Sequence, residues 1–315
     1  MNMNGKGVII YIVGPTGVGK SEISCEVASR VNAEIISADS MQVYKGIHIL
    51  TDKPREVCQQ KVPHHLINVL PIEQAIDVAY FVKLAHEAIG EISQRGKNVL
   101  IVGGTGMYIR GLVDGVFNGP GRDDRIRKKL QHESAEYGSH ALYNRLRQVD
   151  EAAAKKIHDK DTKRIVRALE VYEITGCPIS TLQNQWNNSK DAIMIGLSRE
   201  RKSLYGRIDN RVDRMVACGL VNEVKKIFSL DLQNNKGILQ AIGCKEIIDY
   251  LENKISLDEA ITTIKMHTRQ YAKRQLTWFR KDERINWVEL TESHSVKENS
   301  TRVLKIVKKI LTVTG

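Results

Sequence analysis

The chain of 315 residues lacks a long hydrophobic segment. Its longest apolar stretch near the N-terminus, Val8 to Val13, is six residues long. A signal-peptide core needs more than this, and a membrane-spanning helix needs roughly 20 residues. The sequence also has no repeats, and with 42% hydrophobic and 27% charged residues it does not have a disordered or collagen-like composition. We therefore predict a globular, cytoplasmic protein with no membrane partner.

Cysteine is scarce, and no two cysteines are close in sequence. The five are separated by at least 26 positions, so there is no CxxC pair to hold zinc. Their odd number argues against a disulfide framework. We predict that all five are reduced thiols: Cys25, Cys58, Cys177, Cys218 and Cys244.

Acidic residues are too few to balance the basic ones. The formal charge is +11 and the isoelectric point is near 9.3. Two stretches are especially basic: residues 155–167 hold six Lys or Arg against two acids, and residues 265–284 hold seven against two. Such stretches favour a polyanionic partner such as nucleic acid, although a solvated helix face is the simpler interpretation of either one alone.

The first hundred residues alternate apolar runs with helical patterns. Runs at 8–13, 34–37 and 98–102 are typical of buried strands, whereas 21–31 and 77–95 place apolar residues at helical intervals. This alternation indicates a parallel α/β sheet.

The pattern changes after about residue 115, where a breaker cluster precedes a charged, almost wholly helical region. A strand pattern returns at 192–197, and helices dominate from there to the C-terminus. We predict an α/β fold with a P-loop core (1–118), an inserted helical subdomain (119–191), and the rest of the core with basic C-terminal helices (192–315).

A phosphate-binding loop follows the first predicted strand. The sequence fits GxxxxGK[ST] in full: Gly14, Pro15, Thr16, Gly17, Val18, Gly19, Lys20 and Ser21. In such a loop, backbone amides and the helix N-terminus surround phosphate oxygens, the lysine pairs with a phosphate, and the Ser21 hydroxyl can bind Mg²⁺. The motif is typical of nucleotide-binding and ATP-binding proteins, but it does not specify the phosphate compound.

The acid that usually supports Mg²⁺ at a second strand end is missing. The strand at 98–102 runs into Gly103-Gly104-Thr105-Gly106, whereas Asp39 follows the strand at 34–37. Spacing alone leaves three roles open for Asp39: metal support, helix N-cap, or general base beside a bound phosphate ester.

Several motifs in order resemble those of the tRNA dimethylallyltransferases, bacterial type. They span roughly residues 8 to 288 and include ISADSMQVY at 36–44, PHHL at 63–66, GGTGMY at 103–108, RALEVY at 167–172, RIxxRV from Arg207, AIG at 241–243 and TRQYAKRQLTW at 268–278. Two positions depart from the family: Leu50 stands where a Gly is usual, and Cys244 where a Tyr is usual.

The resemblance implies an enzyme that transfers a dimethylallyl group from dimethylallyl diphosphate to N6 of adenosine 37 in the tRNA anticodon stem-loop. In that case Asp39 is the catalytic base, and Thr16 and Arg207 stabilise the departing diphosphate, with Mg²⁺ at Ser21 as cofactor. We expect a monomer.

The same resemblance implies a set of residues along the tRNA path. They are Asp39, Ser40, Met41, Gln42, Thr105, Asp123, Lys163, Arg164, Ile165, Val166, Arg167, Gln240, Ala241, Ile242, Gly243, Cys244 and Lys245. Three alternatives remain: a nucleotide-dependent kinase or NTPase, a prenyltransferase acting on free adenine nucleotides, and an RNA-binding protein with an unused P-loop.

Overall fold

The computed structural model describes residues 7–116, 119–183, 192–230, 232, 235 and 237–314. Within them the chain divides into two compact units, one formed by residues 1–113 and 190–315 and the other by 114–189. The predicted helical insertion, 119–191, covers much the same segment; residues 117–118 and 184–191, at its edges, lie outside the described part. None of the described helices has the length and apolar character required to cross a bilayer.

The larger unit is built on a parallel sheet of six strands in the order β3-β2-β4-β1-β5-β6. The strands are β1 (Ile9–Val13), β2 (Ala33–Ala38), β3 (His64–His65), β4 (Asn98–Gly103), β5 (Ile193–Arg199) and β6 (Ile285–Leu290). The α/β fold class is thereby confirmed. Helices dominate after β5, as expected, but the edge strand β6 was not predicted from the sequence; its Ile285, Val288 and Leu290 are buried, and it pairs with β5.

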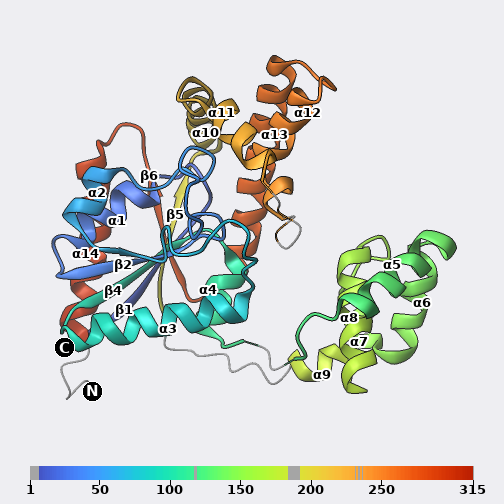
Figure 1. Cartoon of the computed structure of the whole chain (residues 1–315). Helices are drawn as coiled ribbons and strands as arrows, with labels where there is room; N and C mark the ends of the chain where they lie inside the picture. The colour runs from blue at the N-terminus through green and yellow to red at the C-terminus, as the bar shows by residue number, and fades with distance from the viewer. Residues whose placement is uncertain are drawn as a thin grey trace. The chain divides into compact units, whose positions relative to one another are not determined.

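Helices cover both faces of this sheet (Figure 1). They are α1 (Lys20–Ala28), α2 (Glu56–Lys61), α3 (Val78–Gln94), α4 (Gly106–Val113) and α14 (Val296–Thr314). Helices α1 and α14 pack against each other and share one core with alternate residues of the central strands, as expected for buried parallel strands. Helices α3 and α4 pack together, with the Phe81 and Tyr108 rings stacked at 3.9 Å.

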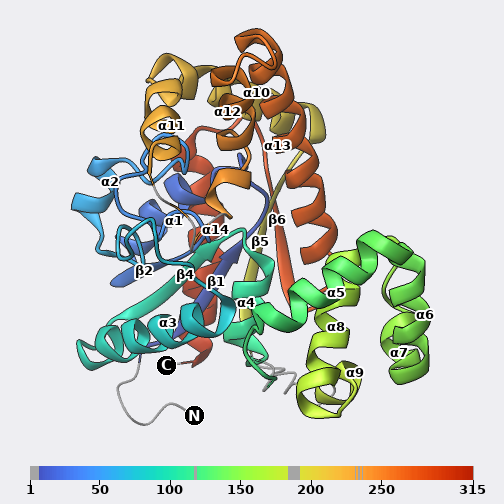
Figure 2. The ribbon, with the colours of Figure 1, turned by 45° about the vertical axis from the view of Figure 1, so that its right-hand side comes forward.

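A second group of helices belongs to the same unit (Figure 2). It comprises α10 (Arg201–Ala217), α11 (Leu220–Phe228), the short 3-10 helix η2 (Ile238–Gln240), α12 (Cys244–Leu251) and α13 (Leu257–Phe279). They enclose a hydrophobic cluster with residues that follow β2, among them Val43, Ile47 and Leu50. This cluster holds the segment after Asp39 in place.

In the part of the smaller unit that the structure describes, all regular elements are helices. Its elements are α5 (Asp124–Tyr137), α6 (Ser139–Val149), α7 (Glu151–Ala154), α8 (Thr162–Thr175) and α9 (Ile179–Gln183). Their apolar faces meet in a core of their own, with Leu130, Leu146, Ile165 and Leu169 fully buried. This separate core explains why the region reads as a distinct insertion in the sequence.

Candidate active site

Three strand ends of the parallel sheet bring the predicted chemistry together. The P-loop follows β1, Asp39 follows β2, and Thr105 follows β4, which lies between those two strands. Parallel strands end at the same edge of a sheet, and ligands bind there in open α/β folds. The proximity expected for Asp39 and the P-loop is therefore a consequence of strand order.

The P-loop has the backbone conformation that its glycines allow. Gly17 and Gly19 have φ angles of 79° and 105°, a region that residues with a Cβ rarely adopt. A Cβ on Gly17 would also lie 2.8 Å from the Ile208 side chain of α10. A larger residue at this position would therefore be strained in the backbone and would force the Ile208 side chain to move.

Lys20 begins α1 and points its ammonium back across the loop. Its Nζ donates hydrogen bonds to the carbonyl oxygens of Gly14 and Pro15 at 2.9 and 2.8 Å. Burial lowers the pKa of Lys20 to about 8; Asp39 and Asp52 act in the opposite direction, and Arg211 adds to the lowering. A bound anion would favour the charged form of this amine.

Three arginines surround the loop, of which sequence reasoning placed only Arg207 in the site. Arg207 donates from Nε to the Gly17 carbonyl at 3.0 Å, and Arg199 does so to the Val18 carbonyl at 2.9 Å. Arg211 donates from Nη1 to Thr16 Oγ1 at 2.8 Å and to Asp52 at 3.2 Å. Arg211 lies one helical turn after Arg207 on α10, and that spacing was the available signal for it.

Asp39 caps the turn that follows β2. Its Oδ1 accepts hydrogen bonds from the amides of Met41 and Gln42 at 2.9 and 3.4 Å. The next residue, Ser40, donates its amide to Thr105 Oγ1 at 3.2 Å. No helix begins here, so Asp39 is not the helix N-cap that spacing left open; it caps a turn instead, and this fixes the carboxylate at the wall of the site.

A cavity of about 800 Å³ within the larger unit is lined by Thr16, Lys20, Asp39, Arg207 and Arg211 among others. Lys20, Arg207 and Arg211 supply cationic walls, Asp39 an acidic one, and Met41 and Ile264 apolar ones. The volume falls within the range of small-molecule sites, which combine apolar walls with a few placed polar groups.

Ser21 lines the same cavity as Lys20 and Asp39, so its hydroxyl fits a Mg²⁺ ion. In the described part of the chain, no group of three or more His, Cys, Asp or Glu could hold a metal without further ligands. Mg²⁺ commonly takes only one or two protein ligands and completes its shell with phosphate oxygens and water. The donor set fits a metal that arrives with a diphosphate.

The predicted tRNA-path residues of the larger unit divide by exposure. Gln240 and Lys245 are exposed, whereas Gly243 and Cys244 are buried. Burial raises the pKa of the Cys244 thiol to about 12, so this thiol is inert. Gln42 is buried as well and hydrogen-bonds to Ser37 and Thr51, a role within the fold.

In the helical unit, part of the predicted tRNA path has structural roles. Ile165 and Val166 lie in the core, Asp123 is the N-cap of α5, and Arg167 pairs with Glu170 at 2.6 Å. The first two side chains cannot reach an RNA, because the helical period turns them inward. Lys163 and Arg164 are exposed, and both remain available for phosphate contact.

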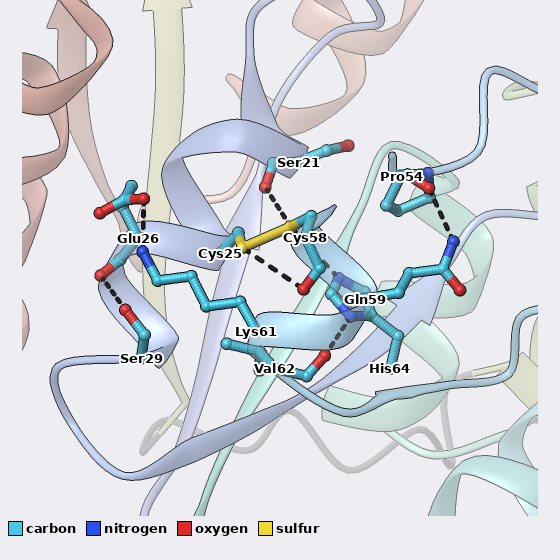
Figure 3. The surroundings of a disulfide bond; sticks show 10 residues. All are labelled: Ser21, Cys25, Glu26, Ser29, Pro54, Cys58, Gln59, Lys61, Val62 and His64. Atoms are coloured by element: carbon cyan, nitrogen blue, oxygen red, sulfur yellow. Dashed lines mark hydrogen bonds and ion pairs between the residues drawn. A yellow bond between two sulfur atoms is a disulfide. The ribbon is translucent and has the colours of Figure 1, made fainter. Parts of the chain in front are cut away.

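The structure also corrects the prediction for two cysteines. A disulfide joins Cys25 of α1 to Cys58 of α2, whose Cα atoms are 6.0 Å apart (Figure 3). The prediction of reduced thiols was wrong here because packing of α1 against α2 unites residues 33 positions apart. Cys177 and Cys218 are free and exposed, and Cys244 is free and buried.

The arrangement is that of a phosphate-loop enzyme with a carboxylate beside the loop, and sequence comparison defines its class further. The model of the family described as IPP transferase matches residues 42–282. The chain belongs to this family. A tRNA dimethylallyltransferase of Carboxydothermus hydrogenoformans is 47% identical, covering 98% of this chain and 97% of that protein. A tRNA dimethylallyltransferase of Geobacter metallireducens is 44% identical over 89% and 92%.

Solved structures agree with this relationship. The full-length tRNA isopentenylpyrophosphate transferase of Bacillus halodurans is similar, with a TM-score of 0.70 and 40% identity covering 96% of each chain. A eukaryotic dimethylallyltransferase acting on tRNA gives a TM-score of 0.80 at 30% identity, covering 97% of this chain and 80% of that one. Both the sequence family and the fold therefore extend over nearly the whole chain.

Proposed function

We propose that this protein transfers a dimethylallyl group from dimethylallyl diphosphate to N6 of adenosine 37 in tRNA, releasing diphosphate. The observation that carries the proposal is the single cavity that presents Asp39 and the P-loop cations Lys20, Arg207 and Arg211 together. The relatives named for this reaction support it. Because tRNA is the acceptor, we also propose that the protein acts in the cytoplasm, as a monomer.

The N6 amine of the acceptor is a weak nucleophile because its lone pair is delocalised into the adenine ring. Asp39 is held by the turn amides in a fixed position on the cavity wall, where its carboxylate can accept the N6 proton as the N–C bond forms. Reaching adenosine 37 requires the base to leave its stack, at a cost of about a few kcal/mol. Thr105 accepts a hydrogen bond from the amide of Ser40, the residue next to Asp39, and we assign it to the support of the base pocket.

The leaving group takes the electron pair of the breaking C–O bond, so negative charge develops on the diphosphate. Lys20, the P-loop amides, and Arg207 and Arg211 are in place to stabilise it before the reaction begins. Of the two arginines, Arg211 reaches the Thr16 hydroxyl directly, and we assign it to the diphosphate along with Arg207. Mg²⁺ held at Ser21, when bound, would neutralise further charge on the diphosphate.

The exposed basic residues are proposed to bind the tRNA backbone. The basic ones are Lys163 and Arg164 in the helical unit and Lys245 in the larger unit, and the neutral Gln240 is also an exposed member of the predicted path. Contacts of this kind position the RNA without reading its sequence. A free adenine nucleotide would have no use for them, which favours tRNA as the acceptor.

The direct test is incubation with labelled dimethylallyl diphosphate, Mg²⁺ and unmodified tRNA, followed by mass spectrometry of the nucleosides. We expect dimethylallyl adenosine from position 37, and none from a tRNA with guanosine there. Parallel reactions with AMP as the acceptor, and with ATP alone, separate the other enzyme classes. Prenylated AMP without prenylated tRNA, or phosphate release from ATP without prenyl transfer, would refute the proposal.

A further inference from the structure

Gln275 of α13 joins two loops of the active site through one buried side chain. Its Oε1 accepts a hydrogen bond from the Thr16 amide at 2.8 Å, and its Nε2 donates one to the Gly104 carbonyl at 2.8 Å. The residue is only 7% exposed. It therefore links the P-loop after β1 to the loop after β4 from a helix far away in sequence.

The two loops belong to opposite halves of the proposed reaction. Thr16 lies in the diphosphate-binding loop and receives Arg211 on its hydroxyl. Gly104 precedes Thr105, which bonds to Ser40 beside the proposed base. The distance between the leaving group and the acceptor base thus depends on how these loops are held together.

Tyr271 extends the connection along the same face of α13. It lies one helical turn before Gln275 and lines the cavity. Burial raises its pKa to about 12; the charge of Asp39 adds to this, and hydrogen bonds with Gln275 and Thr105 oppose it. The phenol therefore remains neutral at working pH, on the face of α13 that carries Gln275.

Gln275 packs closely against Gly104. A Cβ on Gly104 would lie 2.3 Å from Gln275 Nε2 and 3.2 Å from the Gly14 carbonyl oxygen. Only a side chain with both a donor and an acceptor satisfies the Thr16 amide and the Gly104 carbonyl at once. A carboxylate would set two oxygens against each other, and an apolar side chain would leave two buried groups unpaired.

We propose that Gln275 is a positioning residue for the transfer reaction, which fixes the P-loop relative to the acceptor loop so that donor and base are aligned. The inference rests on the proposed function, since it assumes that the two loops hold donor and acceptor. Gln275 acts through Thr16 and Gly104 and needs no contact with either substrate. Its loss misaligns the reactants but leaves the cationic groups that bind diphosphate in place.

The test compares Gln275→Glu, Gln275→Met and Gln275→Asn with Gln270→Glu, a matched change on the exposed side of the same helix. Single-turnover rates are measured at saturating donor and tRNA and expressed per folded molecule, with the folded fraction from circular dichroism. The dissociation constants of inorganic diphosphate and of tRNA are measured separately. We expect the Gln275 variants to lose roughly 10-fold or more in rate, while both dissociation constants change less than about threefold.

The Gln275→Glu variant adds a readout that a purely structural role would not move. Protonation of the carboxyl group introduced at this position restores a donor toward the Gly104 carbonyl. The rate of this variant relative to the wild type at the same pH should therefore rise as the pH falls. Gln270→Glu should match the wild type throughout.

Several results would overturn the inference. These are single-turnover rates within twofold of the wild type, a loss seen only as weaker diphosphate binding, or failure of all three variants to fold, because Gln275 would then serve the fold alone. A wild-type protein that transfers no prenyl group would instead refute the proposed function. The two failures are therefore distinguishable.

Discussion

The P-loop unit and the helical unit use their arginines in different ways. In the P-loop unit, Arg207 and Arg211 line the cavity and contact the phosphate loop. In the helical unit, Arg127 and Arg167 both pair with Glu170, a carboxylate with no exposed area. A basic motif on a tRNA-modifying enzyme thus contains structural cations as well as those available to RNA. The burial of the acidic partner tells them apart, because Glu170 is buried whereas Asp161, the partner of Arg164 at 3.4 Å, is partly exposed.

The largest expected effect concerns Glu170 in the helical unit. Replacing it by Ala leaves two arginines and the Asp123 amide without their partner, which should lower the free energy of unfolding of this unit by about 3–5 kcal/mol. Urea unfolding followed by hydrogen exchange in α5 and α8 measures it. The exposed change Glu151→Ala is the control, with less than about 0.5 kcal/mol expected.

The same residue gives a pH dependence. Burial raises the pKa of Glu170, but hydrogen bonds from Arg127, Arg167 and the Asp123 amide outweigh it and lower the pKa below 4.5. The stabilisation is therefore present above pH 4.5 and is lost as the pH falls through the lower folded value. The Glu170→Ala variant should lack this part of the pH dependence. A variant whose free energy of unfolding falls with acid as steeply as that of the wild type would contradict the structural role of this cluster.

In the P-loop unit, substitutions of the arginines that line the cavity should lower the rate of the transfer reaction. Arg211→Gln removes the contact with Thr16 and a cation from the cavity, and we expect kcat to fall by about 10²-fold with little change in tRNA affinity. Arg207→Gln should have a smaller effect, since its described contacts are the Gly17 carbonyl and Glu22 at 3.7 Å. Steady-state kinetics with varied donor decides this order, and the reverse order would show that Arg207 carries the main contact.

The disulfide gives a third, intermediate effect. Thiol titration of the denatured, unreduced protein should find three thiols, and five after reduction. Reduction should lower the free energy of unfolding of the larger unit by about 2–4 kcal/mol and leave that of the helical unit unchanged. Cys177→Ser is the control, because it removes one thiol without touching this pair. Five thiols before reduction would refute the cross-link.

The smallest effect is expected at the exposed cations of the helical unit. Lys163→Ala and Arg164→Ala should each weaken tRNA binding by roughly 1 kcal/mol and reduce the salt dependence of binding by about one phosphate contact. The rate at saturating tRNA should not change. Binding measured across a salt series tests this, with Lys128→Ala as an exposed control outside the predicted path and outside the basic stretch 155–167. A fall in the saturated rate would contradict the division of labour between the units.

How far the sequence could predict this structure depended on the distance between partners. The P-loop and Asp39 were found because their signals are local: an apolar run, then glycines or an acid at the strand end. The Gln275–Thr16 contact joins residues 259 positions apart, and the Cys25–Cys58 pair depends on the packing of two helices. No local pattern encodes contacts of this kind.

Other features that were not predicted correctly do have a signal in the local sequence. The edge strand β6 alternates only weakly, with Asn286, Trp287 and Glu289 exposed between its buried residues. Ile165 and Val166 were assigned to the tRNA path as part of a block, although the helical period of α8 places both in the core. Applying that period residue by residue would have separated them from Lys163 and Arg164.

The central claim is that the Asp39 carboxylate accepts the proton from the adenine amine while the P-loop holds the departing diphosphate. Asp39→Asn tests it most directly, because an amide oxygen can still accept the Met41 amide and keep the turn, whereas the base is lost. We predict a single-turnover rate at least about 10²-fold below the wild type, with tRNA affinity unchanged within a few fold. An Asn variant that transfers the prenyl group at the wild-type rate would contradict the account.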